Sequence, residues 1–310
     1  MLNPKISIIT ATLNSAKTLP WTMDSVLAQG YKNIEHIIID GGSDDESLKI
    51  IENAHQKYRQ KGFTLTLLSQ KDNGIYDAMN KGINLASGEI VGFLNADDCF
   101  ANCHIAQLIA WGFNKPTKPD IIYADICYVK QNGKFERAIY GKVAREANFS
   151  LGFHPAHPSF YVRREIFTRY GNFDMRYSIS ADYDLMLRFL FKHKLKSLYI
   201  DEIFVKMTLG GISNKSIKNI LKANLQCLQS AKENGVQCAY LAIILKIISK
   251  IYAKIFGTNI DISIDITPPH RALNSLTINK IRRFCESHKN HTIRFCDSVD
   301  STHIGHFYAA

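Results

Sequence analysis

The sequence has no long apolar run near its amino terminus, because residues 1–5 lead directly into a strand-like segment. A secretory signal needs a basic start followed by an apolar stretch of roughly 7–15 residues. We therefore expect neither a signal peptide nor an amino-terminal anchor. This predicts a cytoplasmic protein.

A disulfide framework is also lacking, since the seven cysteines are odd in number and scattered over 310 residues. Such usage is typical of a reducing compartment, where most cysteines act as small core residues. Cys285, His288, His291 and Cys296 have the residue types of a zinc site, but their flanks lack a zinc-finger frame. Structural zinc therefore stays the weaker hypothesis.

Charge is moderate in amount and uneven in placement. Charged residues make up 21% of the chain and hydrophobic residues 46%, which is typical of a folded protein with one substantial core. Residues 211–310 contain 13 of the 38 Lys and Arg residues but 6 of the 28 Asp and Glu residues. No basic and aromatic recognition module accompanies the net charge of +10, so we expect no nucleic-acid partner.

The first part of the chain alternates between two periodicities. Apolar strands are predicted within 5–14, 34–39, 64–68 and 88–94, and helices within 19–30, 48–58 and 76–86. Such alternation predicts βαβ units and a largely parallel sheet.

The second part reads differently. An Asn132-Gly133 pair between residues 121–129 and 135–140 predicts a hairpin. A strand is predicted at 158–162, a helix at 181–193 and one or two short strands within 196–208. Gly210-Gly211 marks a plausible boundary between a domain at residues 1–211 and a basic, helical region at 212–310.

Two helices are predicted beyond this boundary, at 217–234 and 240–256. In the second, Lys246, Lys250 and Lys254 recur every fourth residue and share one stripe. The helix is too short and too charged to span a bilayer. Either it lies on an anionic membrane surface, or it docks on the preceding domain with its lysines in water. We predict no fold for residues 257–310.

Two adjacent carboxylates, Asp97 and Asp98, follow the apolar strand within 88–94. Ligands of open α/β sheets gather beyond the carboxyl ends of the strands. Because neighbouring carboxylates repel each other, a hard divalent cation such as Mg²⁺ or Mn²⁺ would stabilise them. The alternative is that they cap a helix beginning near Asn102.

Other polar groups are predicted at the same edge. Thr12 and Asn14 follow the first strand, and Asp40 with Gly41-Gly42 follows the second. Glycine lets a ligand approach the backbone closely. A nucleotide would fit this crevice, with Asp40 better suited to a base or ribose than to a metal.

Four segments in this order resemble the motifs of glycosyltransferase family 2: residues 8–14, 37–45, 72–83 and 93–98. The resemblance spans about residues 5–211. It is strongest to bacterial enzymes that build exopolysaccharide, capsule or the O-antigen of lipopolysaccharide. It implies a GT-A fold, a nucleotide-sugar donor, usually a UDP-sugar, and Mn²⁺ or Mg²⁺.

The resemblance also assigns residues to the donor site. Ala11, Thr12 and Asp40 fall where the family contacts the nucleotide, and Asp72 is expected to order the loop beneath it. Asn95-Ala96-Asp97 falls on the family's Asp-x-Asp motif, with Asn replacing the first acid. Asp97 is then the expected direct metal ligand, beside Asp98. Gly41 and Leu13 replace a common Asp and a common Tyr, so base stacking at residue 13 is not expected.

For the transfer step, the family uses a carboxylate at the start of a helix in the second half. Asp182 matches this base, with Ala181 where Glu is frequent. Its alternative role is to cap the helix, with Ser180 as the rival cap. Asp184 is the second candidate base, and His157 is expected either to touch the acceptor or diphosphate or to be satisfied within a turn.

We therefore predict an inverting, metal-dependent glycosyltransferase that acts on a saccharide or polyprenyl-linked acceptor, peripheral on the cytoplasmic membrane face. A nucleotidyltransferase is the first rival, although residues 10–14 lack the Gly-rich, basic loop expected of it. A non-catalytic sugar-binding module is the second, supported by Asn95 and Ala181.

Overall fold

The computed structural model describes residues 3–130, 135–143, 149–208 and 216–256. Its first half contains β1 (Ile6–Thr12), α1 (Leu19–Leu27), β2 (Ile34–Asp40), α2 (Ser47–Lys61), β3 (Thr64–Ser69), α3 (Ile75–Leu85) and β4 (Ile90–Phe93). The predicted strands and helices of this part are confirmed. Every residue of β1, β2 and β4 is buried and most of them are apolar, as expected for strands covered on both faces.

The second half is more varied. It contains β5 (Cys99–Phe100), α4 (Ile105–Phe113), β6 (Ile121–Val129), β7 (Phe135–Ile139), a 3₁₀ turn (His157–Ser159), β8 (Tyr161–Arg163), α6 (Arg164–Tyr170), α7 (Ala181–Leu187), a π-helical turn (Arg188–Lys192), β9 (Ser197–Thr208), α8 (Ile217–Glu233) and α9 (Ala239–Phe256). The predicted hairpin is confirmed as the antiparallel pair β6–β7. The segment 196–208 forms one long strand, and Pro158 lies in the turn before β8.

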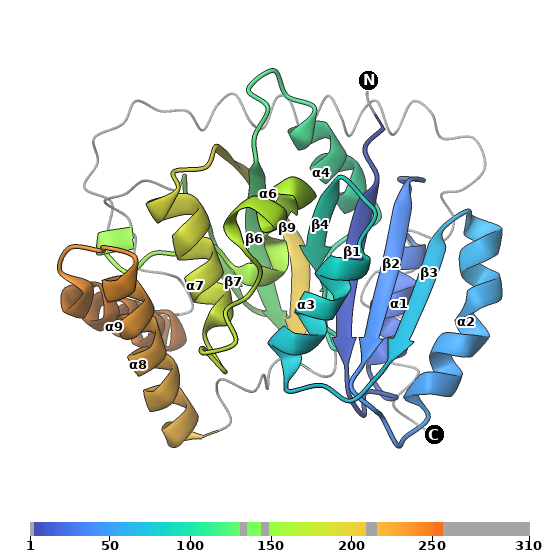
Figure 1. Ribbon diagram of the computed structural model, residues 1–310, viewed down its shortest axis with the longest axis horizontal. Helices are drawn as coiled ribbons and strands as arrows, with labels where there is room; N and C mark the ends of the chain where they lie inside the picture. The colour runs from blue at the N-terminus through green and yellow to red at the C-terminus, as the bar shows by residue number, and fades with distance from the viewer. Residues whose placement is uncertain (1–2, 131–134, 144–148, 209–215, 257–310) are drawn as a thin grey trace.

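The strands form one sheet in the order β3-β2-β1-β4-β8-β6-β9-β5, with β7 paired to β6 (Figure 1). Strands β3, β2, β1 and β4 are parallel, whereas β8 runs antiparallel to both β4 and β6. The predicted parallel sheet therefore covers the first half, and the second half is mixed. Because β1, β2 and β4 point the same way, the segments that follow them meet at one edge.

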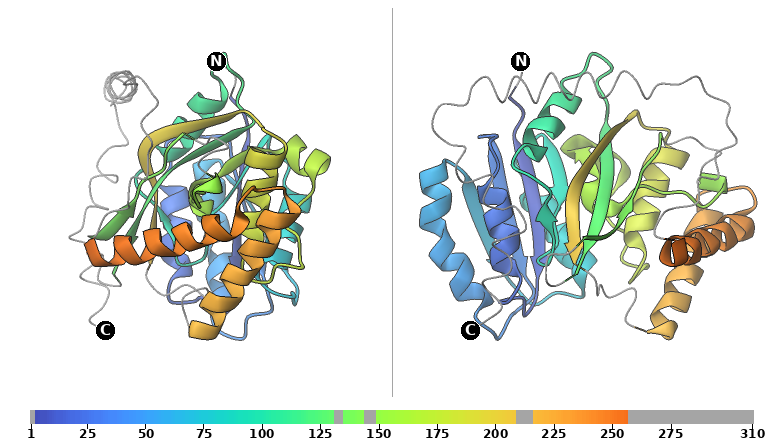
Figure 2. Two further views of the ribbon diagram at one scale, coloured as in Figure 1. Left: turned by 90° about the vertical axis from the view of Figure 1, so that its left-hand side faces the viewer. Right: turned by 180° about the vertical axis from the view of Figure 1, so that it is seen from behind.

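Two apolar layers cover the sheet, one on each face. Side chains alternate along a strand, so Ile9 joins the layer under α3, α6 and α7, whereas Ile8 joins the layer under α1 and α4. Figures 1 and 2 show these helix sets on opposite faces. The fold is the α/β sandwich expected for a GT-A protein.

The carboxyl-terminal helices pack on this sandwich. Helix α8 lies against α7, and α9 crosses α8 (Figure 2). Cys227 and Ala231 of α8 and Ala242 and Ile243 of α9 belong to the apolar layer of α3, α6 and α7. No helix in the described part of the chain is long and apolar enough to cross a bilayer.

Three sequence-based interpretations need correction or fall outside the structure. Lys246 is neither in water nor on an outer stripe: its side chain is buried, donates to Cys227 Sγ at 2.8 Å and lies 4.7 Å from the Tyr183 ring centroid. The side chains of Lys250 and Lys254, and the four candidate zinc ligands, lie outside the described residues. Asp97 and Asp98 cap no helix, because β5 intervenes and α4 begins at Ile105.

Candidate active site

The ends of β1 and β2 place Thr12 beside Asp40, which are paired in register and both buried. The Asp40 carboxylate accepts hydrogen bonds from the Gly42 and Ser43 N–H groups and from the Ser43 and Ser69 hydroxyls. These donors stabilise its charge and fix the loop that follows β2. Asp40 therefore holds the loop after β2 in place from a buried position.

The position of Asp72 explains why residue 41 is a glycine. A Cβ atom at residue 41 would lie 2.5 Å from Asp72 Oδ2, closer than real Cβ contacts allow. Asp72 is itself tied down, because its Oδ1 accepts from the Gly74 N–H at 2.9 Å. The absence of a side chain at residue 41 thus makes room for the nearby Asp72 carboxylate.

The segment after β4 presents one carboxylate outward and one inward. Asp98 is 1% exposed, and its Oδ2 accepts from Asn95 Nδ2 at 2.9 Å. Burial and the neighbouring Asp97 raise the pKa of Asp98 well above its usual range. Asp97 is partly exposed, and its backbone carbonyl accepts from Thr208 Oγ1 at 2.8 Å. The segment is thereby joined to β9, and Ala96 is buried within it.

Oxygen ligands of this kind fit a hard divalent cation, with Asp97 as the accessible carboxylate and Asn95 as an amide oxygen donor. Within the described ranges, no group of three His, Cys, Asp or Glu residues could hold a metal alone. An ion here would therefore complete its coordination with oxygens of a ligand and of water. This is the usual arrangement for Mg²⁺ shared with substrate phosphates.

Three buried polar atoms around this edge have no hydrogen-bond partner among the residues described: Thr12 Oγ1, Asn95 Oδ1 and His157 Nε2. More than nine in ten buried polar groups in folded proteins are paired. Three orphans near the ends of β1 and β4 therefore mark a place where a polar ligand can complete the hydrogen bonding.

His157 is held against β4 by aromatic contacts. Its ring stacks on Phe93 with centroids 5.2 Å apart and meets the edge of Phe173 at 5.5 Å. Burial lowers the pKa of His157, and the nearby Asp182 carboxylate opposes this shift. The imidazole is thus neutral at physiological pH. The ring therefore lies against Phe93, two residues before Asn95, and is close enough to feel the charge of Asp182.

Asp182 lies at the start of α7 and accepts a hydrogen bond from Tyr76 of α3 at 2.9 Å. The Tyr76 hydroxyl is also 2.8 Å from the Ile179 carbonyl oxygen, so two acceptors compete for one proton. Burial and Asp182 raise the pKa of Tyr76 well above 10, which keeps its hydroxyl protonated. The Ser180 side chain at the N-cap of α7 makes no capping hydrogen bond, and Asp182 is already the second residue of the helix.

Sequence reasoning missed Tyr76 and a second support from α8. Gln226 Oε1 accepts from the Ile179 N–H at 3.0 Å, and its Nε2 donates to Ser178 Oγ at 3.2 Å. The Ser180 hydroxyl donates to the Ala223 carbonyl at 3.0 Å. The segment directly before Asp182 is therefore fixed by α8. Tyr76 lies inside the motif at 72–83, but no local pattern predicts contacts across such sequence separations.

Asp184 is placed for packing rather than for substrate contact. It is 3% exposed, and its carboxylate binds Arg188 Nε at 2.7 Å, Ser230 Oγ at 2.7 Å and Asn234 Nδ2 at 3.2 Å. These partners pin α7 to α8. This burial and these contacts disfavour Asp184 both as the second candidate base and as a contact of the acceptor or diphosphate.

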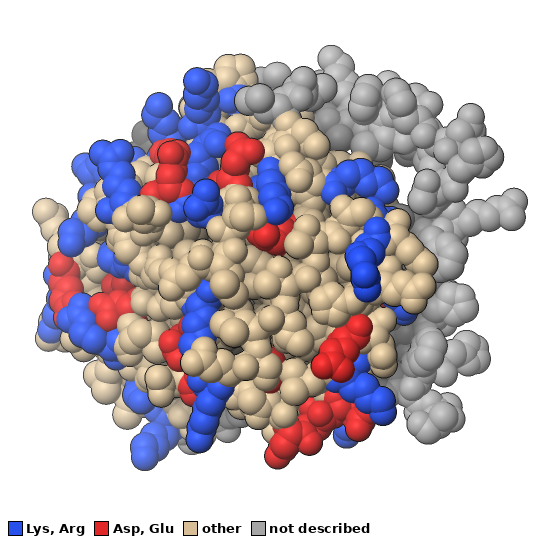
Figure 3. All heavy atoms as spheres, turned by 45° about the vertical axis from the view of Figure 1, so that its right-hand side comes forward, with Lys and Arg blue, Asp and Glu red and all other residues tan. Residues whose placement is uncertain are grey.

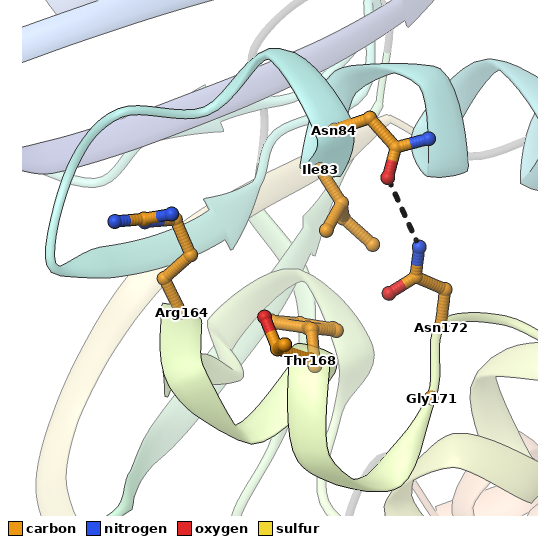
Figure 4. Close-up of a pocket in the computed structure, with 7 residues that line it drawn as sticks. Ile83, Asn84, Arg164, Thr168, Gly171 and Asn172 are labelled. Atoms are coloured by element: carbon orange, nitrogen blue, oxygen red, sulfur yellow. Dashed lines mark hydrogen bonds between the residues drawn. The ribbon is translucent and has the colours of Figure 1, made fainter.

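A cavity of about 450 Å³ lies elsewhere, between the end of α3 and α6 (Figure 4). Asn172 Nδ2 donates to Asn84 Oδ1 across it at 3.5 Å, and Arg164 lines one side. Asn84 is near the opposite end of α3 from Tyr76, roughly 12 Å along the helix. None of the predicted site residues lines this cavity.

Comparison with known proteins identifies the family. The sequence profile of Glycosyl transferase family 2 matches residues 7–171, more than half of the chain. The chain belongs to this family. A "PGL/p-HBAD biosynthesis glycosyltransferase" of Mycobacterium bovis (strain BCG / Pasteur 1173P2) is 31% identical over 225 residues, covering 72% of this chain and 84% of the relative. An uncharacterized glycosyltransferase of Mycobacterium tuberculosis (strain CDC 1551 / Oshkosh) is 29% identical over 60% of this chain and 68% of its own.

Solved structures confirm the GT-A fold of this family 2 member. Residues 1–349 of S. aureus TarS in complex with UDP-GlcNAc align with a TM-score of 0.55 at 16% identity, over 80% of this chain and 73% of that one. The chain spans 44% of a longer TarS structure. The mannosyltransferase PcManGT from Pyrobaculum calidifontis, in complex with GDP-Man and Mn²⁺, aligns with a TM-score of 0.55 at 15% identity, over 91% and 81%.

Proposed function

We propose that this family 2 glycosyltransferase moves a sugar, with inversion, from a UDP-sugar to a hydroxyl group of a saccharide or lipid-linked saccharide. The observation that carries the proposal is the set of buried orphan atoms around the carboxyl edge, one of which belongs to His157 near the Asp182 carboxylate. TarS was solved with UDP-GlcNAc, and a donor of that class supports the choice of UDP.

The donor site of this proposal uses the edge of β1, β2 and β4. Thr12 Oγ1 and Asn95 Oδ1 supply the unpaired buried polar atoms, and the Ala11 backbone borders them. Asp40 and Asp72 hold the two loops that enclose the base and ribose.

A divalent ion, Mn²⁺ or Mg²⁺, held by Asp97 would offset negative charge on the diphosphate. Asp98 supports this position from behind through Asn95. PcManGT was solved with Mn²⁺, which favours an ion of this class.

In the transfer step, Asp182 removes the proton of the acceptor hydroxyl. The acceptor oxygen forms a bond to the anomeric carbon from the side opposite the diphosphate, and the bond from that carbon to the diphosphate oxygen breaks. The proton ends on Asp182 and the electron pair on the nucleoside diphosphate. A carboxylate contributes here by placement, and such proton transfer is worth roughly 10²- to 10⁴-fold.

Tyr76 serves Asp182 in both of its protonation states. While Asp182 is a carboxylate, the tyrosine hydroxyl donates to its Oδ1. After proton transfer, the hydroxyl can donate to the Ile179 carbonyl and accept from the new carboxylic acid. No heavy atom needs to move between the two arrangements.

For the acceptor, we propose a growing bacterial surface polysaccharide or a polyprenyl-linked sugar at the cytoplasmic membrane face. The name of the mycobacterial relative assigns that protein to PGL/p-HBAD biosynthesis, which supports an acceptor with a lipid part. The rival nucleotidyltransferase would consume a nucleoside triphosphate, and a non-catalytic module would turn over nothing.

The decisive experiment combines ligand stabilisation with turnover. UDP with Mn²⁺ should raise the unfolding temperature more than GDP, CDP or ADP, and the enzyme should slowly hydrolyse a UDP-sugar without an acceptor. Asp182→Asn should keep the UDP shift and lose hydrolysis. Pyrophosphate release from UTP and a sugar phosphate would favour the nucleotidyltransferase. Binding without any turnover would favour the module.

A further inference from the structure

Helices α8 and α9 present large apolar side chains to solvent. Leu221 and Leu225 of α8 and Tyr240, Leu241, Ile244 and Ile248 of α9 are each between 46% and 62% exposed. They account for six of the 13 large hydrophobic residues that are exposed in the described part of the chain. A concentration of this kind marks an interaction site more often than scattered single residues do.

Helix α9 carries apolar side chains on its outward side as well as on its buried side. Tyr240, Ile244 and Ile248 recur every fourth residue and form an outward stripe, whereas Lys246 on the opposite side is buried. The helix therefore turns an apolar stripe to solvent although it carries a lysine that could have faced water.

On α8 the outward face mixes apolar and basic residues. Lys218 and Lys222 are exposed and flank Leu221 and Leu225 at helical spacing, while Cys227 on the opposite face is buried. Lys232 joins the two helices, since its Nζ donates to the Tyr240 hydroxyl at 2.6 Å and lies 4.2 Å from the ring centroid.

Together these residues make one surface, the α8–α9 face, consisting of Lys218, Leu221, Lys222, Leu225, Lys232, Tyr240, Leu241, Ile244 and Ile248. Residues 216–256 contain a single acid, Glu233. It hydrogen bonds to Tyr177 and pairs with Arg176. The residues of the face therefore combine apolar side chains with positive charge, and the one acid beside them is engaged by Arg176 and Tyr177. By contrast, Figure 3 shows basic and acidic side chains interspersed on another side of the molecule.

We propose that the α8–α9 face docks on an anionic lipid surface. Interfacial helices bind through an apolar stripe with lysines beside it that attract anionic headgroups, and this face has both features. A second copy of the chain fits less well. In a two-fold dimer through this face, Lys218, Lys222 and Lys232 would meet only apolar and basic side chains of the same face on the other copy.

The docking surface lies directly behind the support of Asp182. The inner side of α8 holds Ile179 and Ser180 through Gln226 and Ala223, while its outer side carries Leu221 and Leu225. Given the proposed function, a membrane-bound α8 would hold Asp182 close to the headgroup layer, where the sugar of a lipid-linked acceptor lies. The surface proposal itself depends on none of the catalytic assignments.

The test is co-sedimentation of the full chain with vesicles, in the absence of donor and acceptor. Vesicles of phosphatidylcholine alone are compared with vesicles that also contain phosphatidylglycerol. The apolar variant is Leu225→Gln with Ile244→Gln and Ile248→Gln, and the charge variant is Lys218→Gln with Lys222→Gln. The matched control, Leu85→Gln with Phe135→Gln and Met175→Gln, removes three exposed apolar residues elsewhere.

We expect the native chain and the control to bind the anionic vesicles equally. The apolar variant should bind at least tenfold more weakly, and the charge variant should lose the preference for phosphatidylglycerol. Circular dichroism and UDP-sugar hydrolysis in solution check that each variant is folded and active, so loss of lipid binding is distinguishable from failure of the proposed chemistry.

Native chain that stays unbound, or apolar and charge variants that bind like the native chain, would overturn the proposal. So would light scattering that shows a dimer in the native chain and a monomer in the apolar variant, because the occupant would then be a second copy.

Discussion

Tyr76→Phe isolates the hydroxyl that links α3 to Asp182. The substitution keeps the ring, which lies 5.3 Å from the Phe173 ring centroid, and removes only the oxygen. Asp182 loses a donor at 2.9 Å, and the Ile179 carbonyl loses one at 2.8 Å.

The size of the effect follows from this geometry. A hydrogen bond to a charged group is worth about 1.5–3 kcal/mol, and here one proton is shared between two acceptors, so the lower half of that range applies. With about 1.4 kcal/mol per tenfold in rate, kcat should fall roughly 10- to 50-fold. KM for the nucleotide-sugar should change little, because the Tyr76 hydroxyl contacts none of the residues predicted to bind it.

The assay is UDP release over a range of donor concentrations, measured for the native chain and the variant. A role in packing alone would lower the unfolding temperature and leave kcat of the folded enzyme unchanged. The matched control is Tyr161→Phe, whose buried hydroxyl has no hydrogen-bond partner in the described residues and whose loss should be neutral.

The result that would refute the reasoning is a folded Tyr76→Phe enzyme with kcat within twofold of the native value. Gln226→Ala offers a second check, since it removes both bonds to the segment before Asp182. Its control is Gln229→Ala on the same helix, where the side chain meets only exposed Glu233.

Four further predictions concern the donor edge and pH. Asp97→Asn should abolish the Mn²⁺-dependent part of the UDP thermal shift while leaving the fold intact, and an unchanged Mn²⁺ titration would contradict its role. Gly41→Ala should lower the unfolding temperature through its clash with Asp72, and adding Asp72→Ala should restore most of the loss. Burial raises the pKa of Asp125 to about 6, so the folded state binds the extra proton and native stability falls as pH rises from about 4 to 6; Asp125→Asn should gain stability over the native chain at pH 7.5 but not at pH 4.5 in thermal melts. Burial lowers the pKa of His36 to about 3, so stability is lost as pH falls from about 6.5 toward 3, and His36→Gln should make that acid loss shallower in denaturant titrations.

The first half of the fold was predictable because its signals are local. Short apolar runs predict β1, β2 and β4, and amphipathic periodicity predicts the helices between them. The alternation of strands and helices then implies parallel strands. That rule alone brings Thr12 and Asp40 together, and the register of β1 and β2 confirms the pairing. The Asn132-Gly133 pair in the sequence likewise predicted the β6–β7 hairpin.

The second half was less predictable because its pairings are distant in sequence. The three residues of β8 insert between β4 and β6, and β5 pairs with β9 across about 100 residues, which no short window of sequence encodes. The same limit applies to the site. Tyr76 and Asp182 are far apart in the chain, as are Ile179 and Gln226, and only tertiary packing joins them. Lys246 was misplaced because periodicity alone cannot tell which stripe of a helix is buried.

The hydrogen bonds from α8 to the segment before Asp182 limit how the carboxyl-terminal helices can be exchanged between relatives. The family profile ends at residue 171, so both the helix carrying the carboxylate and the helix steadying it lie in the part that the profile does not match. Exchanging the carboxyl-terminal region of one relative for that of another would therefore replace the helix that supports the proposed base, together with whatever that region binds. Chimeras joined between β9 and α8 should have a low kcat unless residues 178–180 and 223–226 are transferred together from the same relative.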